Sequence, residues 1–499
     1  MNNSKLKRNV ILGFGSNFII LMLGLVVPRI TIKSYGSDVN GLLGTVTQIF
    51  AYMALLEAGI GQAARNALYK PFVNRDKESV SEVASTAQKY FHRITLYYGI
   101  GVALCSLLFP FILKSNIDKI SIALIFMFEG MSGVITFYFI QTPTIILSMD
   151  GRGYIGSIID VVNRIVSYAV KIFMAYMGIN IIFLELVYFL ITICKVVFYT
   201  GYFKKNYSWI KFNRKENKSV LKERNSYVIT EIAWTVFSST DLIVLSIFVG
   251  TQVSSVYAVY NMVFSSLNNV LHAIYANINY VLGCTYHENI KKYERIHDGY
   301  TSLFLGMMTV LMSVAYILTI PFIKLYTEGV SDVNYIYKSL PLWLCLIRIF
   351  SWARYVSGNL TGIAGYAKQT SKVSFIEAVV NIVLSVVLVK KYGIVGVTFA
   401  TVVALPLKVL YCTYIADKRV LKRSYKKTVG IWCANIVVFS FAIFIERNVA
   451  FNISNYVSFI LTGIILLPIF FIFGFIMNGI ANREFVSIVK TMIKKKRGW

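Results

Sequence analysis

The stretch "LGLVVPRITIK", from Leu23 to Lys33, lies near the end of an apolar run that begins at Val10. It contains a proline, which removes a helix hydrogen bond and bends the helix. It also contains an arginine, which costs roughly 2.5–3.5 kcal/mol at the centre of a bilayer on insertion scales. The run is long enough to cross a membrane, so Pro28 and Arg29 are costly residues that need a reason within a first transmembrane helix.

The composition of the whole chain extends this interpretation. Of the 499 residues, 57% are hydrophobic, whereas an ordinary soluble protein has about 45–50%. A helix needs roughly 20 apolar residues to cross the bilayer. The sequence therefore predicts an all-α integral membrane protein with about fourteen transmembrane helices, near residues 10–32, 40–60, 91–113, 120–147, 154–177, 179–203, 226–249, 254–283, 299–323, 334–356, 372–391, 393–416, 428–446 and 455–479.

Membrane topology explains the net charge of +27 better than binding to nucleic acid does. With the N-terminus in the cytoplasm, the inner segments hold 35 of the 50 Lys and Arg residues and the outer segments hold 8. This asymmetry follows the positive-inside rule and predicts that both termini are cytoplasmic. Basic tails beside anionic lipid account for the remaining charge without nucleic acid.

No catalytic or metal-binding pattern stands out. The six cysteines are scattered without a CxxC pair, so neither a disulfide framework nor a zinc site is expected. A Gly-rich nucleotide loop, a nucleophile elbow and a cluster of metal ligands are all missing from the sequence. We therefore expect no cofactor, no metal and no direct use of ATP, and we expect that the protein is not an enzyme.

The two halves of the chain resemble each other. "IIDVVNRIVS" (Ile158 to Ser167) matches "FIEAVVNIVLS" (Phe375 to Ser385), and "KVVFYT" (Lys195 to Thr200) matches "KVLYCT" (Lys408 to Thr413), at a spacing of roughly 210–217 residues. We expect two six-helix bundles, at residues 1–203 and 226–417, joined by a basic connector at 204–225. An extra helix pair at 418–480 and a basic tail at 481–499 follow. Repeats of six helices have the same orientation, and a transport site is expected between them.

Ionisable residues within the apolar runs are the candidate site. Arg164 lies near the middle of its helix, and helical geometry puts Asp160, Arg164 and Lys171 on one face. That face must meet a water-filled cavity or a protein interior. A simple ion pair between Asp160 and Arg164, four residues apart, is the alternative, although it leaves Lys171 unexplained.

Further cations complete the predicted cationic cavity. Lys195 and Lys408 hold matching places in the two halves, where two ammonium groups suit a diphosphate, but both could instead extend to the inner membrane surface. Arg348 lies mid-helix between two tryptophans. Arg354 is expected to reach the inner surface. The substrate-binding set is Arg29, Arg164, Lys171, Lys195, Arg348 and Lys408.

Four carboxylates are candidates for ion coupling or gating: Glu57, Asp160, Asp241 and Glu377. A protonatable Asp241 in "SSTDLIVLS" could couple transport to protons, and a structural hydrogen bond is the alternative. The Tyr- and Asn-rich stretch from Tyr257 to Tyr280 suits a sugar, because it combines stacking surfaces with hydrogen-bonding groups. A polar helix buried in a bundle explains the same stretch equally well.

Two stretches of the sequence resemble a known family. "GLVVPRITIKSYGSDVNGLLGTVTQIFAYMALLEAGIGQA" in the first two predicted helices and "STDLIVLSIFVGTQVSSVYAVY" in the seventh resemble the oligosaccharide flippases of the Wzx type. These flippases belong to the multidrug/oligosaccharidyl-lipid/polysaccharide (MOP) exporter superfamily, with the lipid II flippases and the MATE transporters. The resemblance covers essentially the whole chain and identifies the superfamily more firmly than the substrate.

The resemblance implies a V-shaped helical bundle in the bacterial cytoplasmic membrane. It implies transfer of an undecaprenyl-pyrophosphate-linked oligosaccharide to the outer leaflet for surface polysaccharide such as O-antigen or capsule, driven by H⁺ or Na⁺. A polysaccharide polymerase and a chain-length regulator are the implied partners. Carried over, Pro28 supplies a bend and Arg29 contacts the diphosphate, although Arg29 could instead reach the outer headgroups. The second predicted helix has no arginine in its apolar part, which weakens lipid II as the substrate.

Two other classes remain open. A drug or cation antiporter of the same superfamily predicts an anionic cavity, and the deep Arg164 and the paired lysines argue against that. A membrane-embedded glycan polymerase or ligase usually displays its catalytic residues on a sizeable outer loop, and no outer segment here is long enough.

Overall fold

The computed structural model describes residues 3–213, 217 and 240–496. The described residues form helices and contain no strand, as the sequence predicted. Seven described helices are long and apolar enough to cross a membrane by length and composition, so the chain is a multi-pass membrane protein. The count of fourteen transmembrane helices stays a prediction, and the helix expected at 226–249 lies outside the described residues except for 240–249, of which 240–248 are helical.

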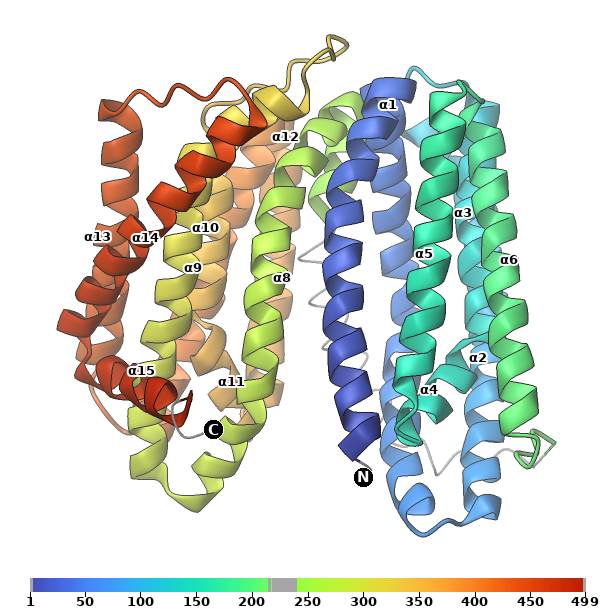
Figure 1. Ribbon diagram of the computed structural model, residues 1–499, viewed down its shortest axis with the longest axis horizontal. Helices are drawn as coiled ribbons and strands as arrows, with labels where there is room; N and C mark the ends of the chain where they lie inside the picture. The colour runs from blue at the N-terminus through green and yellow to red at the C-terminus, as the bar shows by residue number, and fades with distance from the viewer. Residues whose placement is uncertain (1–2, 214–216, 218–239, 497–499) are drawn as a thin grey trace. The chain divides into compact units, whose positions relative to one another are not determined.

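The chain divides into two compact units, Met1–Ser255 and Val256–Trp499. In unit 1, long helices run side by side, and short α4 lies near one end (Figure 1). Its helices are α1 (Asn3–Val73), α2 (Lys77–Ile112), α3 (Lys119–Phe139), α4 (Gln141–Met149), α5 (Gly153–Tyr176) and α6 (Ile181–Asn206).

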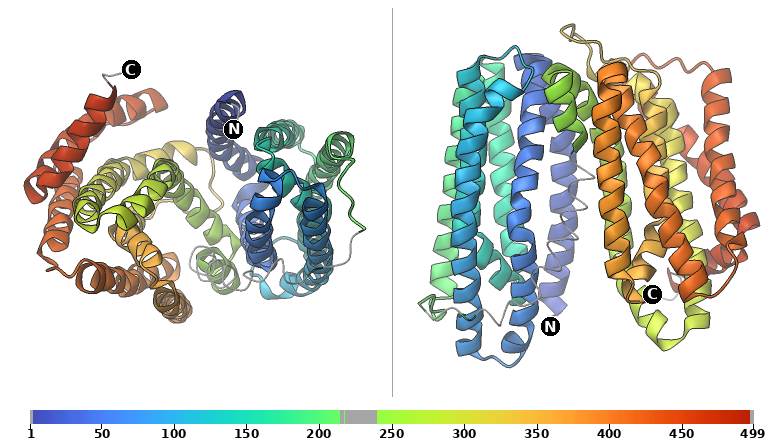
Figure 2. Two further views of the ribbon diagram at one scale, coloured as in Figure 1. Left: turned by 90° about the horizontal axis from the view of Figure 1, so that it is seen from below. Right: turned by 180° about the vertical axis from the view of Figure 1, so that it is seen from behind.

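In unit 2, α13 and α14 pack together and against α9, as the views in Figure 2 show. The amphipathic α15 also lies against α9. The helices are α8 (Thr251–Glu288, which begins in unit 1), α9 (Ile290–Tyr326), α10 (Leu340–Ala353), α11 (Tyr355–Ile363), α12 (Ala367–Tyr414), the π-helix η2 (Ile415–Val420), α13 (Lys426–Asn448), α14 (Tyr456–Ala481) and α15 (Arg483–Lys496).

Glycines with positive φ mark the turns between helices. In α1 the chain reverses direction at Gly36, where φ is 84° and ψ is 169°, so two predicted helices are joined by a very short turn (Figure 1). The backbone stays helical at Pro28, whose predicted bend is therefore separate from this reversal. In α12 the break falls at Gly393, with φ 53°. Only glycine adopts such conformations readily.

The same turns recur along the sequence. Gly36 and Gly151, with φ of 84° and 70°, are each followed 214 residues later by another glycine of positive φ, Gly250 and Gly365. The backbone thus repeats at the spacing that the sequence motifs indicated.

Two helices that the sequence predicted as continuous are broken. The expected helix 120–147 divides at Ile140 into α3 and α4, and the expected helix 334–356 begins only at Leu340 and divides at Arg354 into α10 and α11. The two breaks are again 214 residues apart. Each expected range is apolar overall, which is why the hydrophobic pattern did not reveal the breaks.

Packing within each unit is apolar, and polar caps set several helix ends. Phe91, Ile146 and Tyr199 belong to one buried cluster of unit 1, and Val438 and Phe470 belong to a cluster that ties α13 and α14 to α9. The side chains that cap helix N-termini are those of Asp76, Asp118, Asn180, Asn289 and Asn455. Hydrogen bonds from Ser79 lower the pKa of the Asp76 carboxyl.

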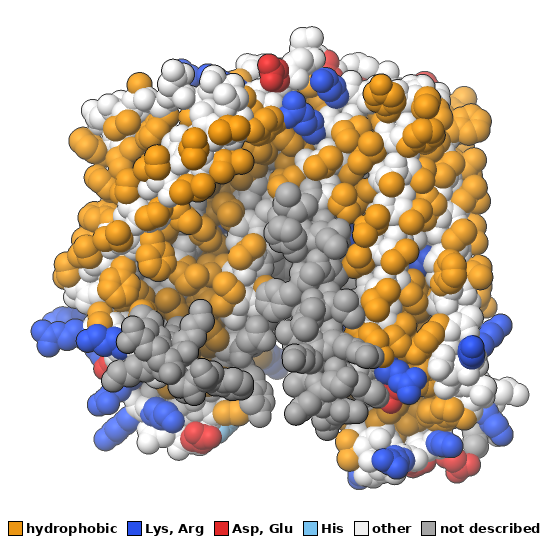
Figure 3. Space-filling model, viewed as in Figure 1, with side chains coloured by type: hydrophobic (Ala, Val, Ile, Leu, Met, Phe, Trp, Pro, Cys, Tyr) orange, Lys and Arg blue, Asp and Glu red, His pale blue; other side chains and the backbone are white. Residues whose placement is uncertain are grey.

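The surface agrees with a membrane setting. On the face drawn in Figure 3, hydrophobic side chains cover the middle of each unit, and Lys and Arg side chains gather mainly at its lower end in that view. Exposed residues of α14, such as Ile464, Ile465 and Phe471, contribute to the apolar surface of unit 2. A surface of this kind suits lipid rather than water.

Candidate functional site

The first candidate group joins α5 to α6. The ammonium of Lys195 lies 2.7 Å from Asp160 Oδ1, and the Lys195 side chain is 17% exposed. The carboxylate thus meets a cation on the next helix, whereas the sequence had offered Arg164 on the same helix as its partner. An ion pair between helices fixes their relative rotation as well as balancing charge.

Arg164 lies one helical turn beyond Asp160 and has a different environment. Its side chain is exposed on the surface of unit 1, and the structure records no hydrogen bond or ion pair for it among the described residues. The sequence predicts that α5 crosses the membrane, and a guanidinium is costly in hydrocarbon, so we expect this part of α5 to face water, a ligand or protein. Arg164 therefore has the chemistry of an anion-binding residue.

Lys171 lies further along the same face of α5 and contacts residues of α6. Its ammonium lies 3.0 Å from Glu185 Oε1 of α6 and 4.4 Å from the centre of the Tyr188 ring. Glu129 of α3 is close enough to interact electrostatically with both charges. A small cavity of about 10 Å³ lies beside this group, between α1, α5 and α6.

Unit 2 contains a related group. The guanidinium of Arg354, at the break between α10 and α11, lies 3.0 Å and 3.2 Å from the two carboxylate oxygens of Glu377 in α12. Lys408, in the later part of α12, interacts electrostatically with both. The expectation that Arg354 extends to the membrane surface is wrong, because this residue is only 7% exposed and its charge is bound within the bundle.

The groups in the two units occupy equivalent positions of the repeat. Asp160 corresponds to Glu377 and Lys195 to Lys408 in the matched motifs. Each half thus brings one carboxylate and one lysine into electrostatic contact, and the second half adds Arg354. The predicted lysine pair is therefore accompanied by carboxylates, a feature that a count of charges could not reveal.

Arg348 and the Tyr/Asn-rich stretch meet within unit 2. Arg348 donates to Asn261 Oδ1 at 2.7 Å, and the Trp352 indole donates to Asn268 Oδ1 at 2.9 Å. His272 and the Tyr355 hydroxyl are 2.6 Å apart. The described tyrosines Tyr257, Tyr260 and Tyr275 are buried, which favours the buried-helix interpretation over a sugar-stacking surface for these three side chains.

The remaining predicted residues are Glu57, Asp241 and Arg29. Glu57 accepts a hydrogen bond from Gln141 at 2.8 Å at the start of α4. Asp241 is buried, beside Tyr52, whose hydroxyl lies 2.5 Å from the Thr240 hydroxyl. Arg29 is half-buried in α1, one residue after Pro28.

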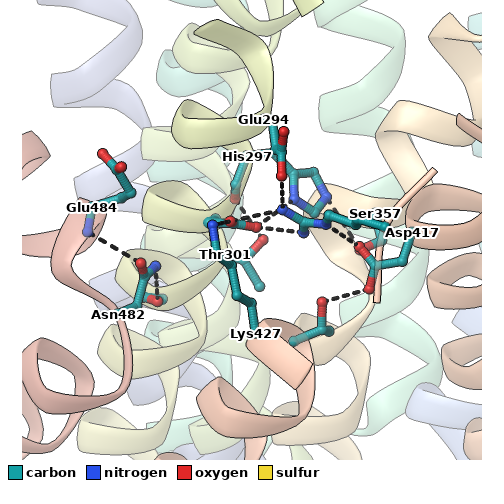
Figure 4. A network of polar contacts seen from close by, with 12 residues as sticks. Glu294, His297, Thr301, Ser357, Asp417, Lys427, Asn482 and Glu484 are labelled. Atoms are coloured by element: carbon teal, nitrogen blue, oxygen red, sulfur yellow. Dashed lines mark hydrogen bonds and ion pairs between the residues drawn. The ribbon is translucent and has the colours of Figure 1, made fainter. Parts of the chain in front are cut away.

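A further polar network, which the sequence did not single out, lies in unit 2 (Figure 4). Arg423 binds Asp298 of α9, with nitrogen–oxygen distances of 2.5 Å and 2.8 Å, and Asp417 of η2 at 2.8 Å. Asp417 also accepts from Thr428 of α13 at 2.6 Å. This network ties the segment before α13 to α9 (Figure 4). The sequence had counted Arg423 only as one of six basic loop residues, and no local signal separates it from the others.

The fold has counterparts among solved structures. No family model matches the sequence, and no curated protein matches it either. Among solved structures, the chain is similar to a lipid II flippase MurJ in an inward closed conformation, with a TM-score of 0.68 and 17% identity over 92% of this chain and 97% of that chain.

Two multidrug transporters have the same fold. An inward-facing MATE family transporter of the MOP superfamily matches with a TM-score of 0.66 and 14% identity over 88% of this chain and 99% of that chain. The MATE multidrug transporter DinF-BH matches with a TM-score of 0.60 and 13% identity over 85% of this chain and 98% of that chain. Together with its all-helical units, these similarities show that the chain has the fold of the MOP superfamily of flippases and multidrug transporters.

Proposed function

We propose that this protein is a flippase for an undecaprenyl-pyrophosphate-linked oligosaccharide, which it moves from the cytoplasmic to the outer leaflet for assembly of a surface polysaccharide. The observation that carries the proposal is Arg164, an exposed cation within α5 that has no ion pair with another described residue. A fold shared with a lipid II flippase supports the same class of substrate.

The charges suit a diphosphate. A diphosphate with a hydrophilic glycan cannot cross about 30 Å of hydrocarbon unaided, because removing water from its charges is very costly. Guanidinium and ammonium groups replace that hydration through charge-assisted hydrogen bonds. Arg164 is the leading contact, with Lys195, Lys408 and Arg29 as further contacts.

The carboxylates give the lysines two states. Lys195 is paired with Asp160 at 2.7 Å. A diphosphate carries more charge than one carboxylate and competes for the ammonium when it arrives. Lys171 and Arg348 are bonded to Glu185 and Asn261, so the proposal gives them a smaller part in substrate binding.

Alternating access driven by H⁺ or Na⁺ completes the proposed cycle. The protein would act in the bacterial cytoplasmic membrane with both termini in the cytoplasm, beside a polysaccharide polymerase and a chain-length regulator. Glu57, Asp160, Asp241 and Glu377 are the proposed coupling or gating residues.

A multidrug antiporter is the second candidate, because two of the similar structures are named as MATE multidrug transporters. Such a protein would use its carboxylates to hold a cationic drug. The exposed Arg164 opposes this, since it would repel the cation. Sensitivity to cationic drugs after deletion would favour the antiporter.

The deciding experiment measures the leaflet location of polyprenyl-pyrophosphate-linked glycan after depletion of the protein. Completed units should accumulate on the cytoplasmic face while surface polysaccharide is lost. Complementation with Arg164→Gln should restore little export, whereas Lys291→Gln, which changes an exposed residue of α9, should restore it fully. Normal surface glycan and an unchanged pool of intermediates after depletion would contradict the proposal.

A further inference from the structure

A largely buried group of ionisable residues in unit 1 has a charge imbalance. It consists of Glu129 from α3, Lys171 from α5 and Glu185 from α6, and α6 packs against both of the other helices. Glu185 is fully buried and binds the Lys171 ammonium at 3.0 Å. Glu129 interacts electrostatically with both. Two carboxyl groups therefore share one ammonium.

Among the described residues that interact with the group, none supplies a second cation. Tyr98 from α2 and Tyr188 from α6 interact electrostatically with members of the group, Tyr168 from α5 interacts with Tyr188, and Tyr35 approaches from α1. The Tyr35 hydroxyl donates to the Ile179 carbonyl at 2.7 Å, so it does not serve the carboxylates. Tyrosines are neutral near pH 7. If both carboxyl groups were ionised, the group would carry a net charge of −1 inside the bundle.

The hydrogen bonding of the two carboxyl groups points to one added proton. Glu129 Oε2 and Glu185 Oε2 are buried, and neither has a hydrogen-bond partner in the part of the chain that the structure describes. A buried ionised carboxylate normally has its oxygens paired, whereas a neutral carboxylic acid avoids the cost of an unpaired charge. One added proton removes the net charge.

We propose that Glu129, Lys171 and Glu185 form a proton-binding site that holds one proton on its carboxyl pair. Because the Lys171 ammonium binds Glu185 at 3.0 Å, the proton resides mainly on Glu129. The adjoining cavity, lined in part by Thr31, Tyr35, Lys171 and Glu185, is about 10 Å³ and has room for about one water molecule to carry the proton.

The consequence for transport rests on the proposed function. Release of the proton leaves a net negative charge among α3, α5 and α6 and weakens their packing. Uptake of the proton removes this charge and restores the packing, so a pH gradient can favour one conformation of unit 1 over another. This would make the group the coupling site for H⁺, in addition to the carboxylates considered above.

Infrared spectroscopy of the full-length purified protein tests the site without any transport assay. A protonated carboxyl group has a carbonyl stretching band, shifted by deuterium exchange, that an ionised carboxylate lacks. Relative to the wild type at neutral pH, Glu129→Gln should lose the intensity of one such carboxyl group. Glu185→Gln should lose the same amount, because the remaining Glu129 and Lys171 balance each other. Glu446→Gln, at an exposed residue of α13, should change nothing.

Lys171→Met should change the intensity of the carboxyl band in the opposite direction. Without the ammonium both carboxyl groups should be protonated, so the band should gain the intensity of one carboxyl group. Glu129→Gln combined with Lys171→Met should return it to the wild-type value. An unchanged band in both Glu→Gln variants would overturn the proposal, as would an unchanged band in Lys171→Met.

These outcomes are independent of the substrate. The expected bands together with wild-type glycan export after depletion would support the proton site and contradict the flippase. Unchanged bands together with lost export would contradict the proton site and support the flippase.

Discussion

Asp160 of α5 and Lys195 of α6 form an ion pair of 2.7 Å, and the residues at the equivalent positions of the second half, Glu377 and Lys408, interact electrostatically within α12. The repeat therefore preserves a contact between two charges and not only a similarity of sequence. In unit 2 a third charge, Arg354, takes the hydrogen bonds of the carboxylate.

Substrate should compete with Asp160 for the ammonium of Lys195. Lys195→Met should weaken binding of a short-chain polyprenyl diphosphate about ten- to a hundredfold, because a hydrogen bond to a charged group contributes about 1.5–3 kcal/mol. Asp160→Asn should strengthen binding, since it releases the ammonium. Titration calorimetry of the purified protein measures both, with Lys291→Gln as the control. Equal weakening by both variants would mean that the pair is structural.

The buried pair of unit 2 should be important for stability. Arg354→Gln should destabilise the protein by about 3–5 kcal/mol, because Glu377 is left charged and buried. Thermal unfolding in detergent should show a large fall in melting temperature. The double variant Arg354→Gln with Glu377→Gln should be more stable than Arg354→Gln alone, and a double variant that is no better would disprove the coupling of the two residues.

A close helix contact in unit 1 requires a glycine at position 41. A methyl group on Gly41 would collide with the backbone carbonyl of Thr251, which cannot move aside as a side chain can. Gly41→Ala should therefore destabilise the protein by about 1–3 kcal/mol or more. Gly201→Ala in α6 is the matched control, because a Cβ there would meet nothing within 4 Å. It should be neutral or stabilising by about 0.5–1 kcal/mol, and similar melting temperatures for the two variants would refute the argument.

The network around Arg423 should hold the segment before α13 in place. Arg423→Gln removes the cation between Asp298 and Asp417, both of which are buried, so it should lower the melting temperature strongly. Arg423→Lys should be intermediate, since an ammonium cannot reproduce the planar fork of the guanidinium. Arg419→Gln, which changes an exposed residue of η2 that contacts Tyr414, should have little effect. Limited proteolysis before α13 offers a local readout, and unchanged cleavage in Arg423→Gln would argue against a role in holding this segment.

The sequence by itself determined that the protein is helical, that it lies in the membrane and that its halves repeat. Apolar runs of about 20 residues have few alternatives in a bilayer, because every backbone polar group must be paired within the helix. The motifs around Asp160 and Glu377 also indicated a repeat at a spacing of roughly 210–217 residues, and the glycine turns at Gly36 and Gly250 are 214 residues apart.

Only the tertiary structure decided which charges meet. Asp160 pairs with Lys195, 35 positions away, and not with Arg164 on its own helix, while Arg354 is buried against Glu377. Glu129 and Glu185 are 56 residues apart along the chain, yet both act on Lys171. These contacts depend on the rotation and depth of each helix against its neighbours. Hydrophobic composition specifies that a helix is buried in the membrane but carries little information about which side of it faces which neighbour.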